Sequence, residues 1–432
     1  MKSRSGNEAF WKDLHILETL KGGGIYLVVK IAGSIGAYFF AWYVSKAYGA
    51  AGNGVFAFVL TAAVLLASFF NLGLNTYTVK LLPAYKAQNN PGGIRAFYHR
   101  ALTTVAGVTF AGSGILILLS FLMSNESFSR DLYLIGCATI PVSILLFISH
   151  VYKARQRIFG FSMLQNNVIQ VLALLILVIP VWDRSSTNEP VWAFIVAGVG
   201  LCIAGWGMIP SIHGEQTPIS KTEFRLHIRE SLPMLAGGMA FIVLNLTDRF
   251  MLRFLDSTTQ LGIYDVALRL SNLTLLGIMS LNAVAEPKFA QLHAENDPTK
   301  LRSFAGRITW MGIVVSIPVI GLLGFFPDFW LGLFGTGEDF LVGGSTLRIL
   351  LLGQALSVSC GAVLVLLNMT GHQRSVQTIL FTCATLNIIL NFLLIPWWGI
   401  DGTAWATAFS TLVWNVWGLW IIRKKLGFWM WG

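Results

Sequence analysis

The sequence predicts an all-α integral membrane protein with about twelve transmembrane helices. Three observations predict this fold class. Hydrophobic residues make up 55% of the 432 residues and charged residues only 12%, and the mean hydropathy is +0.67, far from the roughly quarter-charged make-up of soluble domains. Twelve apolar segments are each long enough for the roughly 20 residues that cross about 30 Å of hydrocarbon as a helix. The connectors between them alternate between rich and poor in Lys and Arg.

The predicted spans share an apolar composition and are separated by short connectors. They cover residues 25–45, 55–75, 101–122, 132–151, 161–181, 191–210, 233–254, 264–286, 308–326, 342–368, 375–395 and 403–422. Before the first span, residues 1–21 are polar and charged, which predicts a cytoplasmic segment without a cleaved signal. Apolar side chains at helical spacing in residues 8–20 fit either a short amphipathic helix or a solvated tail.

The basic residues predict the orientation of the chain. With a cytoplasmic amino terminus, 22 of the 30 Lys and Arg residues fall in cytoplasmic segments, and only Lys46, Arg130 and Arg184 fall in outer loops. Because basic residues are retained on the cytoplasmic side, we expect both termini to be cytoplasmic and the protein to lie in the cell inner (cytoplasmic) membrane. The net charge of +10 then reflects topology and contact with anionic membrane lipids, and no nucleic-acid partner is expected.

An internal repeat divides the chain into two halves. Gln156–Arg157 opens the fifth span and Gln373–Arg374 opens the eleventh, and each of these spans closes at a proline. Gly54–Phe56 at the start of the second span likewise matches Gly262–Tyr264 at the start of the eighth. Six spans separate the copies, so both halves have the same orientation in the membrane. We therefore expect two six-helix bundles around a central cavity.

This repeat gives the expected domain organisation. It comprises a cytoplasmic N-terminal segment (1–21), an N-terminal six-helix bundle (22–215), a cytoplasmic linker (216–232) and a C-terminal six-helix bundle (233–432).

Ionisable residues inside the predicted spans are the candidate functional residues. A charge near the bilayer centre costs roughly 2.5–3.5 kcal/mol on insertion scales, so it is retained where it has a role. The candidate substrate-binding or cavity residues are Lys30, Asp248, Arg249, Arg253, Asp265, Arg269 and Glu286, and Arg348 is a further charge within a span.

Two segments of the second half, together with one of the first, resemble a known family. Thr247–Leu252, followed by Gly262–Tyr264, is similar to the seventh and eighth helices of polysaccharide flippases. Leu394–Thr407 resembles the signature that precedes their last helix, and Asn71–Asn75 is similar to the segment that ends their second. The resemblance is to the multidrug, oligosaccharidyl-lipid and polysaccharide (MOP) exporter superfamily, in its polysaccharide transporter branch of O-antigen and capsule-type flippases.

This resemblance implies a MATE-like fold and transport by alternating access, with two bundles rocking around a hydrated cavity. It also implies a substrate, a polyprenyl-pyrophosphate-linked oligosaccharide such as an O-antigen, capsule or exopolysaccharide repeat unit, which moves to the outer leaflet. A polysaccharide polymerase is a partner that the resemblance allows.

Against this background, Arg249 and Arg253 are the candidates for the anionic headgroup. They lie four residues apart and share one helix face, so an anionic partner is expected there. Guanidinium groups present a planar fork of donors to pyrophosphate oxygens. We expect Arg249, with Arg253 either beside it or snorkelling to the interface, to attract the headgroup. Asp248 would then orient the cluster or couple to a cation.

The other charges leave alternatives open. Asp265 and Arg269 share a face and form either a neutralising pair near the outer headgroups or a substrate contact. Lys30 lies about six residues inside the first span and fits either a cavity or snorkelling. Asn387 and Asn391 fit interhelical hydrogen bonds or contacts with sugar hydroxyls.

The motifs of enzymes and metalloproteins do not occur. The sequence contains no GxxxxGK[ST] phosphate loop and no HExxH, and its four cysteines lie in spans without CxxC spacing. We therefore expect no enzymatic activity, no cofactor and no metal site. The competing functions are an ion-coupled multidrug exporter of the MATE type, which calls for unpaired acidic residues deep in the cavity, and a structural membrane protein.

Overall fold

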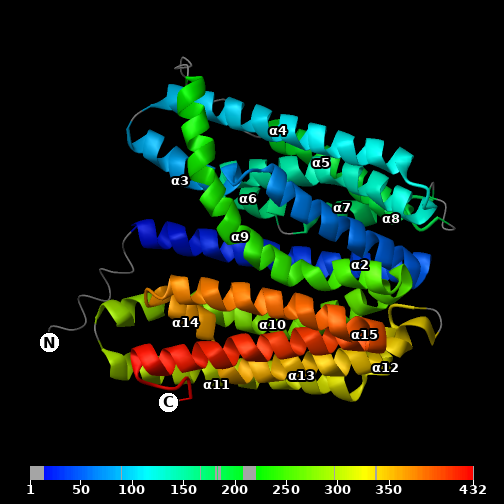
Figure 1. Ribbon diagram of the computed structural model, residues 1–432. Helices are drawn as coiled ribbons and strands as arrows, with labels where there is room; N and C mark the ends of the chain where they lie inside the picture. Colours follow the sequence, from blue (N-terminus) through cyan, green and yellow to red (C-terminus); the bar gives the residue numbers. More distant parts are fainter. Residues whose placement is uncertain are drawn as a thin grey trace. The chain divides into compact units, whose positions relative to one another are not determined.

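The computed structural model describes residues 14–88, 90–165, 167–180, 182, 186–207, 220–295, 297–335 and 338–431. Within these residues the chain forms α-helices and one short 3-10 helix, and no strand (Figure 1). The predicted all-α fold class is confirmed. Arg184 and residues 8–13 of the predicted amphipathic segment lie outside the described residues, whereas residues 14–20 form the first turns of α2.

The chain divides into two compact units. Unit 1 contains Met1–Tyr43, Ala62–Arg184 and Asn188–Ala236, and unit 2 contains Val44–Thr61, Ser185–Thr187 and Gly237–Gly432, as far as these ranges are described. The helices of unit 1 are most of α2 (Leu14–Phe70), α3 (Leu74–Ala87), α4 (Pro91–Leu122), α5 (Glu126–Ala154), α6 (Ile158–Gln165), α7 (Val168–Leu177), α8 (Glu189–Gly207) and the first part of α9 (Lys221–Leu255). The helices of unit 2 include α10 (Thr258–Ala294), α11 (Pro298–Phe325), α12 (Pro327–Gly332), η1 (Glu338–Gly343), α13 (Gly344–Cys360), α14 (Val363–Met369) and α15 (Gln373–Leu426).

These units differ from the predicted bundles at two places. Residues 44–61, predicted in the N-terminal bundle, pack in unit 2. Residues 221–232, predicted as a linker, form the first turns of α9 and pack in unit 1.

The twelve predicted spans all coincide with helical structure among the described residues. Eight helices of this part of the chain are long and apolar enough to cross a membrane, or nine when the bent pair α6 and α7 is taken as one span. Two of them, α2 and α15, each hold two predicted spans, separated by non-helical backbone at Gly49 and at Gly399. The 35-residue α9 contains the remaining predicted span.

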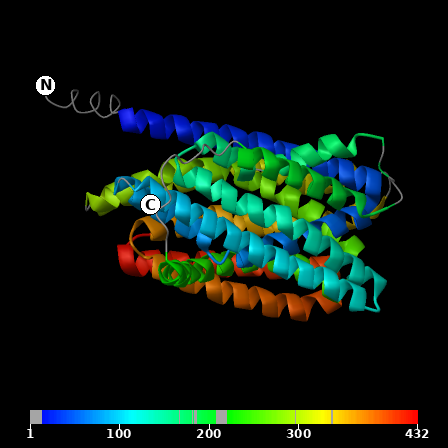
Figure 2. The ribbon, with the colours of Figure 1, turned by 90° about the horizontal axis from the view of Figure 1, so that it is seen from above.

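Side-chain caps fix where several helices begin. Asn90 and Asn125 accept the backbone N–H groups of Gly93 and Phe128 at the starts of α4 and α5. Ser257 and Asp297 do the same at the starts of α10 and α11. A cap of this kind replaces a hydrogen bond that the first turn of a helix cannot make within itself. In unit 1 the capped helices α4 and α5 run side by side (Figures 1 and 2).

Two glycines that the internal repeat matches, Gly54 and Gly262, lie against each other in unit 2. A Cβ atom at Gly54 would collide with the backbone oxygen of Thr258, and one at Gly262 would collide with that of Ala50. The amide of Asn53 donates to the Gly262 carbonyl oxygen at 2.9 Å. The helix segment 44–61 and α10 therefore cross in backbone contact, which only residues without a side chain permit.

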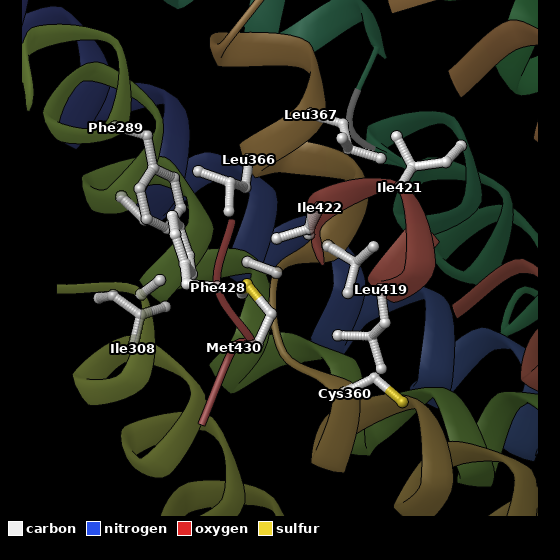
Figure 3. Packing of buried hydrophobic residues seen from close by; sticks show 14 of the residues in the cluster. Phe289, Ile308, Cys360, Leu366, Leu367, Leu419, Ile421, Ile422, Phe428 and Met430 are labelled. Carbon is white, nitrogen blue, oxygen red and sulfur yellow. The ribbon is translucent and has the colours of Figure 1, made fainter. Parts of the chain in front are cut away.

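A hydrophobic core cluster of unit 2 includes residues that follow α15. Phe428 and Met430 follow the last turn of α15 and pack among Phe289, Leu366 and Ile422 (Figure 3). Both side chains are almost fully buried. The indole Nε1 of Trp431 donates to the carbonyl oxygen of Ser359 at 2.6 Å. The carboxyl-terminal residues are thus part of the packed bundle.

In unit 1, a buried histidine holds the first turns of α9 against α3. The Tyr77 hydroxyl donates to Oε2 of Glu230 at 2.7 Å and lies 2.9 Å from Nδ1 of His227. Since that hydroxyl has a single hydrogen, Nδ1 of His227 must be the donor to Tyr77. Nε2 lies 3.4 Å from the Tyr85 hydroxyl, from which it accepts in neutral His227 and to which it donates in the protonated form. Because burial disfavours the charged form, this contact favours neutral His227.

Acidification should loosen this contact. Burial lowers the pKa of His227 below its usual value near 6.5, although Glu223 and Glu230 oppose the shift. A lowered folded-state pKa means that the stabilisation is present above about pH 6.5 and is lost as the pH falls through the lowered value. Hydrogen exchange of the α9 residues 222–231 should therefore accelerate, beyond the intrinsic pH effect, when the pH falls from about 7.5 to about 5.5.

The variant His227→Gln should remove this pH dependence, whereas His99→Gln, at an exposed histidine of α4, should keep it. Equal pH dependence in both variants would contradict the assignment to His227.

Candidate functional site

Three helices of unit 2 bring charged and polar side chains together in a group that we call the polar cluster. Its members are Asp248 and Arg249 on α9, Tyr264, Asp265 and Arg269 on α10, and Asn387, Asn391 and Thr407 on α15. Four of these residues were predicted as site residues from the sequence: Asp248, Arg249, Asp265 and Arg269. The cluster contains two carboxylates with different surroundings.

The first carboxylate, Asp265, holds two arginines. Arg249 donates from Nε to Oδ1 at 2.9 Å, and its Nη2 lies 2.9 Å from the same oxygen. Arg269, one helical turn further along α10, donates from Nε to Oδ2 at 2.6 Å. Only 1% of the Asp265 side chain is exposed, against 16% of each arginine. One buried negative charge thus orients two guanidinium groups, and the three residues carry a net charge of about +1.

The second carboxylate, Asp248, is bound by neutral donors. The Tyr264 and Thr407 hydroxyls donate to Oδ2 at 2.7 and 2.6 Å, and the Asn391 amide donates to Oδ1 at 3.0 Å. The same Asn391 amide lies 3.1 Å from Oδ1 of Asn387. Asn391 Oδ1 is itself buried and has no hydrogen-bond partner among the described residues. Asp248 therefore lies in an oxygen-rich, buried site without a guanidinium donor to its carboxylate among these contacts.

The backbone break inside α15 makes this second site. Asn391 and Thr407 are 16 residues apart, which would separate them by about 24 Å in a straight helix. Both nevertheless reach the carboxylate of Asp248, because the backbone turns at Gly399, whose φ is +52°. This left-handed conformation is one that glycine adopts readily. Beside the turn, Asp401 accepts hydrogen bonds from Ser345 and Thr346 of α13, which fixes it within unit 2.

Arg249 and Arg253, for which the sequence predicts an anionic partner, contact different groups in the structure. The anionic partner of Arg249 is Asp265 of the protein itself, 16 residues away on α10. The guanidinium of Arg253 lies over the ring of Phe58, 5.7 Å from its centre, where a cation is stabilised by the aromatic face. The two arginines therefore have different surroundings, although they share a helix face. Asp265 and Arg269 form the intrahelical pair that their spacing predicts.

The remaining predicted residues lie outside the polar cluster. Lys30 is half-buried on α2 in unit 1. Glu286 is exposed on α10, 21 residues and about 31 Å along the helix from Asp265. Arg348, on α13, is also exposed, and its Nε lies 3.4 Å from the Gly324 carbonyl oxygen.

Sequence reasoning missed Tyr264 and Thr407, the two hydroxyl donors to Asp248. Both residues lie within the segments that resemble the polysaccharide flippases, and this resemblance could have indicated them as site residues. Asn391 forms an interhelical hydrogen bond, which is one of the two roles considered for it. Among the described residues, no group of three or more His, Cys, Asp or Glu side chains is placed to hold a metal ion.

Two family models match the chain. The model described as polysaccharide biosynthesis protein matches residues 19–293, and the model described as MatE matches residues 233–393. A curated relative, Uncharacterized membrane protein MJ1068 of Methanocaldococcus jannaschii, is 20% identical over 396 residues, which is 86% of this chain and 78% of that protein.

Solved structures share the fold over most of the chain. Lipid II flippase MurJ in an inward closed conformation has a TM-score of 0.76 at 13% identity, covering 92% of this chain and 87% of that one. An inward-facing multidrug resistance MATE family transporter of the MOP superfamily has a TM-score of 0.68 at 12% identity, covering 93% and 98%. At these identities the likeness shows the fold, and the MATE-like fold class expected from the sequence is confirmed.

Replacing Asp265 with Asn should destabilise unit 2 strongly. The change leaves two partly buried arginines without their shared carboxylate, and breaking a buried ion pair from one side costs about 3–5 kcal/mol. Adding Arg269→Gln should recover part of this loss, because the second change removes one unpaired charge. Thermal unfolding in detergent measures both effects.

The matched control is Asp297→Asn, which removes a carboxylate paired with Lys300 at the exposed start of α11. It should have little effect, since exposed ion pairs contribute little. An Asp265→Asn protein as stable as this control would contradict the proposed role of Asp265 in unit 2.

Proposed function

Because the chain belongs to the polysaccharide biosynthesis protein family of the MOP exporter superfamily, we propose that it is a flippase for a polyprenyl-pyrophosphate-linked oligosaccharide. The substrate would be a repeat unit of an O-antigen, capsule or exopolysaccharide. It would cross the cytoplasmic membrane from the inner to the outer leaflet by alternating access. The family matches indicate a multi-pass membrane transporter rather than a catalytic enzyme.

The observation that most directly supports a pyrophosphate-linked substrate is the pair of arginines around Asp265. A single carboxylate offsets one of two guanidinium charges, and each arginine side chain keeps 16% of its surface exposed. An anionic group near this pair gains charge-assisted hydrogen bonds, and the planar guanidinium matches the oxygens of a pyrophosphate. Asp265 supplies the orientation, so little ordering of the side chains is needed when the substrate binds.

Other features support a lipid-linked substrate in the cytoplasmic membrane. The fold is similar to that of a lipid II flippase. The excess of basic residues in alternate connectors supports cytoplasmic termini and an inner-membrane location. Lys30, Arg253 and Glu286 are not members of the polar cluster and remain proposed cavity residues because they are charges within or at the end of predicted spans.

Asp248 is the proposed coupling residue. Its carboxylate is buried among hydroxyl and amide groups, and the unpartnered Oδ1 of Asn391 adds a further oxygen to its surroundings. Such oxygen-rich surroundings suit a proton or a small monovalent cation. A gradient of that ion would supply the energy for transport, because the sequence has no phosphate loop for ATP hydrolysis.

The second candidate function is an ion-coupled multidrug exporter of the MATE type. The MatE model matches residues 233–393, which include Asp248, and a buried carboxylate is the feature that this function requires. Against it, the polar cluster contains two arginines, and positive groups disfavour a cationic drug.

Replacing Arg249 with Ala should lower translocation about tenfold or more without reducing membrane insertion. Membrane insertion should persist because Asp265 keeps Arg269 as its partner. Translocation should fall because the variant loses a cation that attracts the anionic headgroup of the substrate. The measurement is mass spectrometry of polyprenyl-pyrophosphate lipids in cells that depend on the variant, with sidedness probed by a membrane-impermeant glycosidase. A complete oligosaccharide unit should accumulate in the cytoplasmic leaflet.

Arg348→Ala is the matched control, because it removes an arginine within a predicted span but outside the polar cluster. It should leave the lipid pools unchanged. Wild-type translocation by the Arg249→Ala protein would refute the role of this arginine. Unchanged lipid pools on depletion of the whole protein, with greater sensitivity to cationic drugs, would favour the multidrug exporter.

Replacing Asp248 with Asn should uncouple transport from the ion gradient. The fold should tolerate this change because the Tyr264 and Thr407 hydroxyls can still donate to the side-chain oxygen of the new Asn. Collapsing the proton or sodium gradient in cells should stop translocation by the natural protein and have no further effect on the already impaired variant. Equal sensitivity of the two proteins to the gradient would contradict the coupling role.

A further inference from the structure

The residues that follow α15 in unit 2 alternate between buried and exposed side chains. The helix is followed by Gly427, whose φ of +82° is a left-handed conformation that glycine adopts readily. Beyond this turn, Phe428 and Met430 are buried in the core cluster (Figure 3). Trp429 and Trp431 alternate with them and keep 41% and 49% of their surfaces exposed. Their rings are stacked, with centroids 6.2 Å apart and an interplanar angle of 23°. The turn therefore places two indoles next to each other on the surface.

Three consecutive basic residues in the last turn of α15 accompany these indoles. The guanidinium of Arg423 lies 5.9 Å from the centre of the Trp429 ring, and its Nη1 donates to a backbone carbonyl oxygen of the turn at 2.6 Å. Nζ of Lys424 lies 4.9 Å from the centre of the Trp420 ring, one helical turn earlier. Lys425 is exposed as well. We call this group the tryptophan–basic patch, and its members are Trp420, Arg423, Lys424, Lys425, Trp429 and Trp431.

The positive charge of this patch is not offset by a carboxylate among the described residues. No Asp or Glu occurs in residues 402–431, and none of the three cations forms an ion pair within the described part of the chain. Elsewhere in unit 2, Lys288 donates to Gln291 at 3.0 Å. Lys300 lies 2.8 Å from a carboxylate oxygen of Asp297. An aromatic face, in contrast, stabilises a cation without neutralising it. The patch therefore keeps a charge of about +3, which suits an anion.

An open apolar groove runs along α15 to the same patch. Its lining residues are Leu412, Val413, Val416, Trp417 and Trp420. The eight residues from Leu412 to Trp420 rise about 12 Å, which fits within the roughly 15 Å of hydrocarbon in one leaflet. Trp420 belongs to both features, because it ends the groove and its ring lies beneath Lys424. A hydrocarbon chain in this groove would therefore end beside a cation.

An anionic phospholipid is the ligand whose chemistry matches both features. A free phosphate would use the cations and leave the groove unused, and a neutral lipid would do the reverse. An acidic peptide or a nucleic acid would not need a groove lined by apolar side chains alone. Under the predicted topology the last span ends in the cytoplasm, so the patch lies at the level of the inner-leaflet headgroups. Anionic lipids of that leaflet attract clustered basic residues.

We propose that the patch and the groove together bind one anionic phospholipid of the inner leaflet. Its phosphate is held by the three cations of the patch, and one acyl chain lies along the groove of α15. The proposal concerns a discrete site with a single bound lipid, beyond the general attraction of a basic surface to the membrane. It does not depend on the proposed function, because it uses none of the residues of the polar cluster.

The test is native mass spectrometry of the delipidated full-length protein in detergent. Phosphatidylglycerol and phosphatidylcholine with the same acyl chains are titrated separately. One phosphatidylglycerol should bind with a Kd about tenfold or more below that of phosphatidylcholine. Glycerol 3-phosphate, which has the phosphate but no acyl chain, should compete poorly. Equal affinity for the two lipids, or competition by glycerol 3-phosphate as strong as that by phosphatidylglycerol, would overturn the proposal.

A pair of double variants separates a discrete site from attraction by overall charge. Lys424→Gln with Lys425→Gln should weaken binding of phosphatidylglycerol about tenfold or more and leave phosphatidylcholine unaffected. The control is Arg302→Gln with Arg307→Gln, which removes the same charge from exposed positions of α11 in unit 2. Both pairs lie in cytoplasmic segments under the predicted topology. A loss of equal size in the two double variants would refute the site.

Trp420→Leu tests the connection between the patch and the groove while keeping every cation. Removing the indole beneath Lys424 should weaken binding of phosphatidylglycerol several-fold. Trp397→Leu is the control, because Trp397 is an exposed tryptophan of α15 that does not line the groove. Both side chains are exposed, so both variants should fold. Undiminished binding by the Trp420→Leu protein would contradict the assignment.

Discussion

The carboxylate of Asp265 is the interaction on which the arrangement of the polar cluster depends. Charges within membrane-spanning helices are tolerated when they are paired, and here one buried carboxylate pairs with arginines from two helices. The contact with Arg249 links α9 to α10, and the contact with Arg269 stiffens one turn of α10. Without this anion the two cations would repel each other in a poorly solvated region. The ion pairs therefore position α9 and α10 as well as their own side chains.

Adjacent residues on α9 and α10 build two sites of different chemistry. Asp248 precedes Arg249, and Tyr264 precedes Asp265, so the same two helix turns supply both carboxylates. Asp265 has charged partners from α9 and α10, whereas Asp248 has neutral partners that include Asn391 and Thr407 of α15. The first site carries a net positive charge, and the second surrounds one carboxylate with oxygen atoms. The two proposed roles, attraction of an anion and ion coupling, would therefore belong to neighbouring carboxylates within unit 2.

Sequence reasoning predicted the features that depend on local periodicity. Helical structure at the twelve predicted spans and the Asp265–Arg269 pair follow from apolar length and from four-residue spacing, and both are found among the described residues. The pairing of Arg249 with Asp265 could not be predicted in this way, because it depends on how α9 faces α10. The donors to Asp248 from α15 depend further on the backbone turn at Gly399. This turn lies between two apolar segments, and the hydrophobic pattern of each segment is the same with or without it, so the pattern does not predict the turn.

The repeat in the sequence and the units in the structure do not have the same boundaries, and the two glycines of the repeat explain why. Gly54 belongs to the first half of the sequence, yet its backbone lies against Thr258 and Gly262 of α10. Contact this close buries backbone on both sides and is reinforced by the hydrogen bond from Asn53 to Gly262. These interactions hold residues 44–61 in unit 2, while the rest of α2 packs in unit 1. A motif that is repeated in the sequence therefore meets its own copy in the fold, and this crossing determines to which unit that part of α2 belongs.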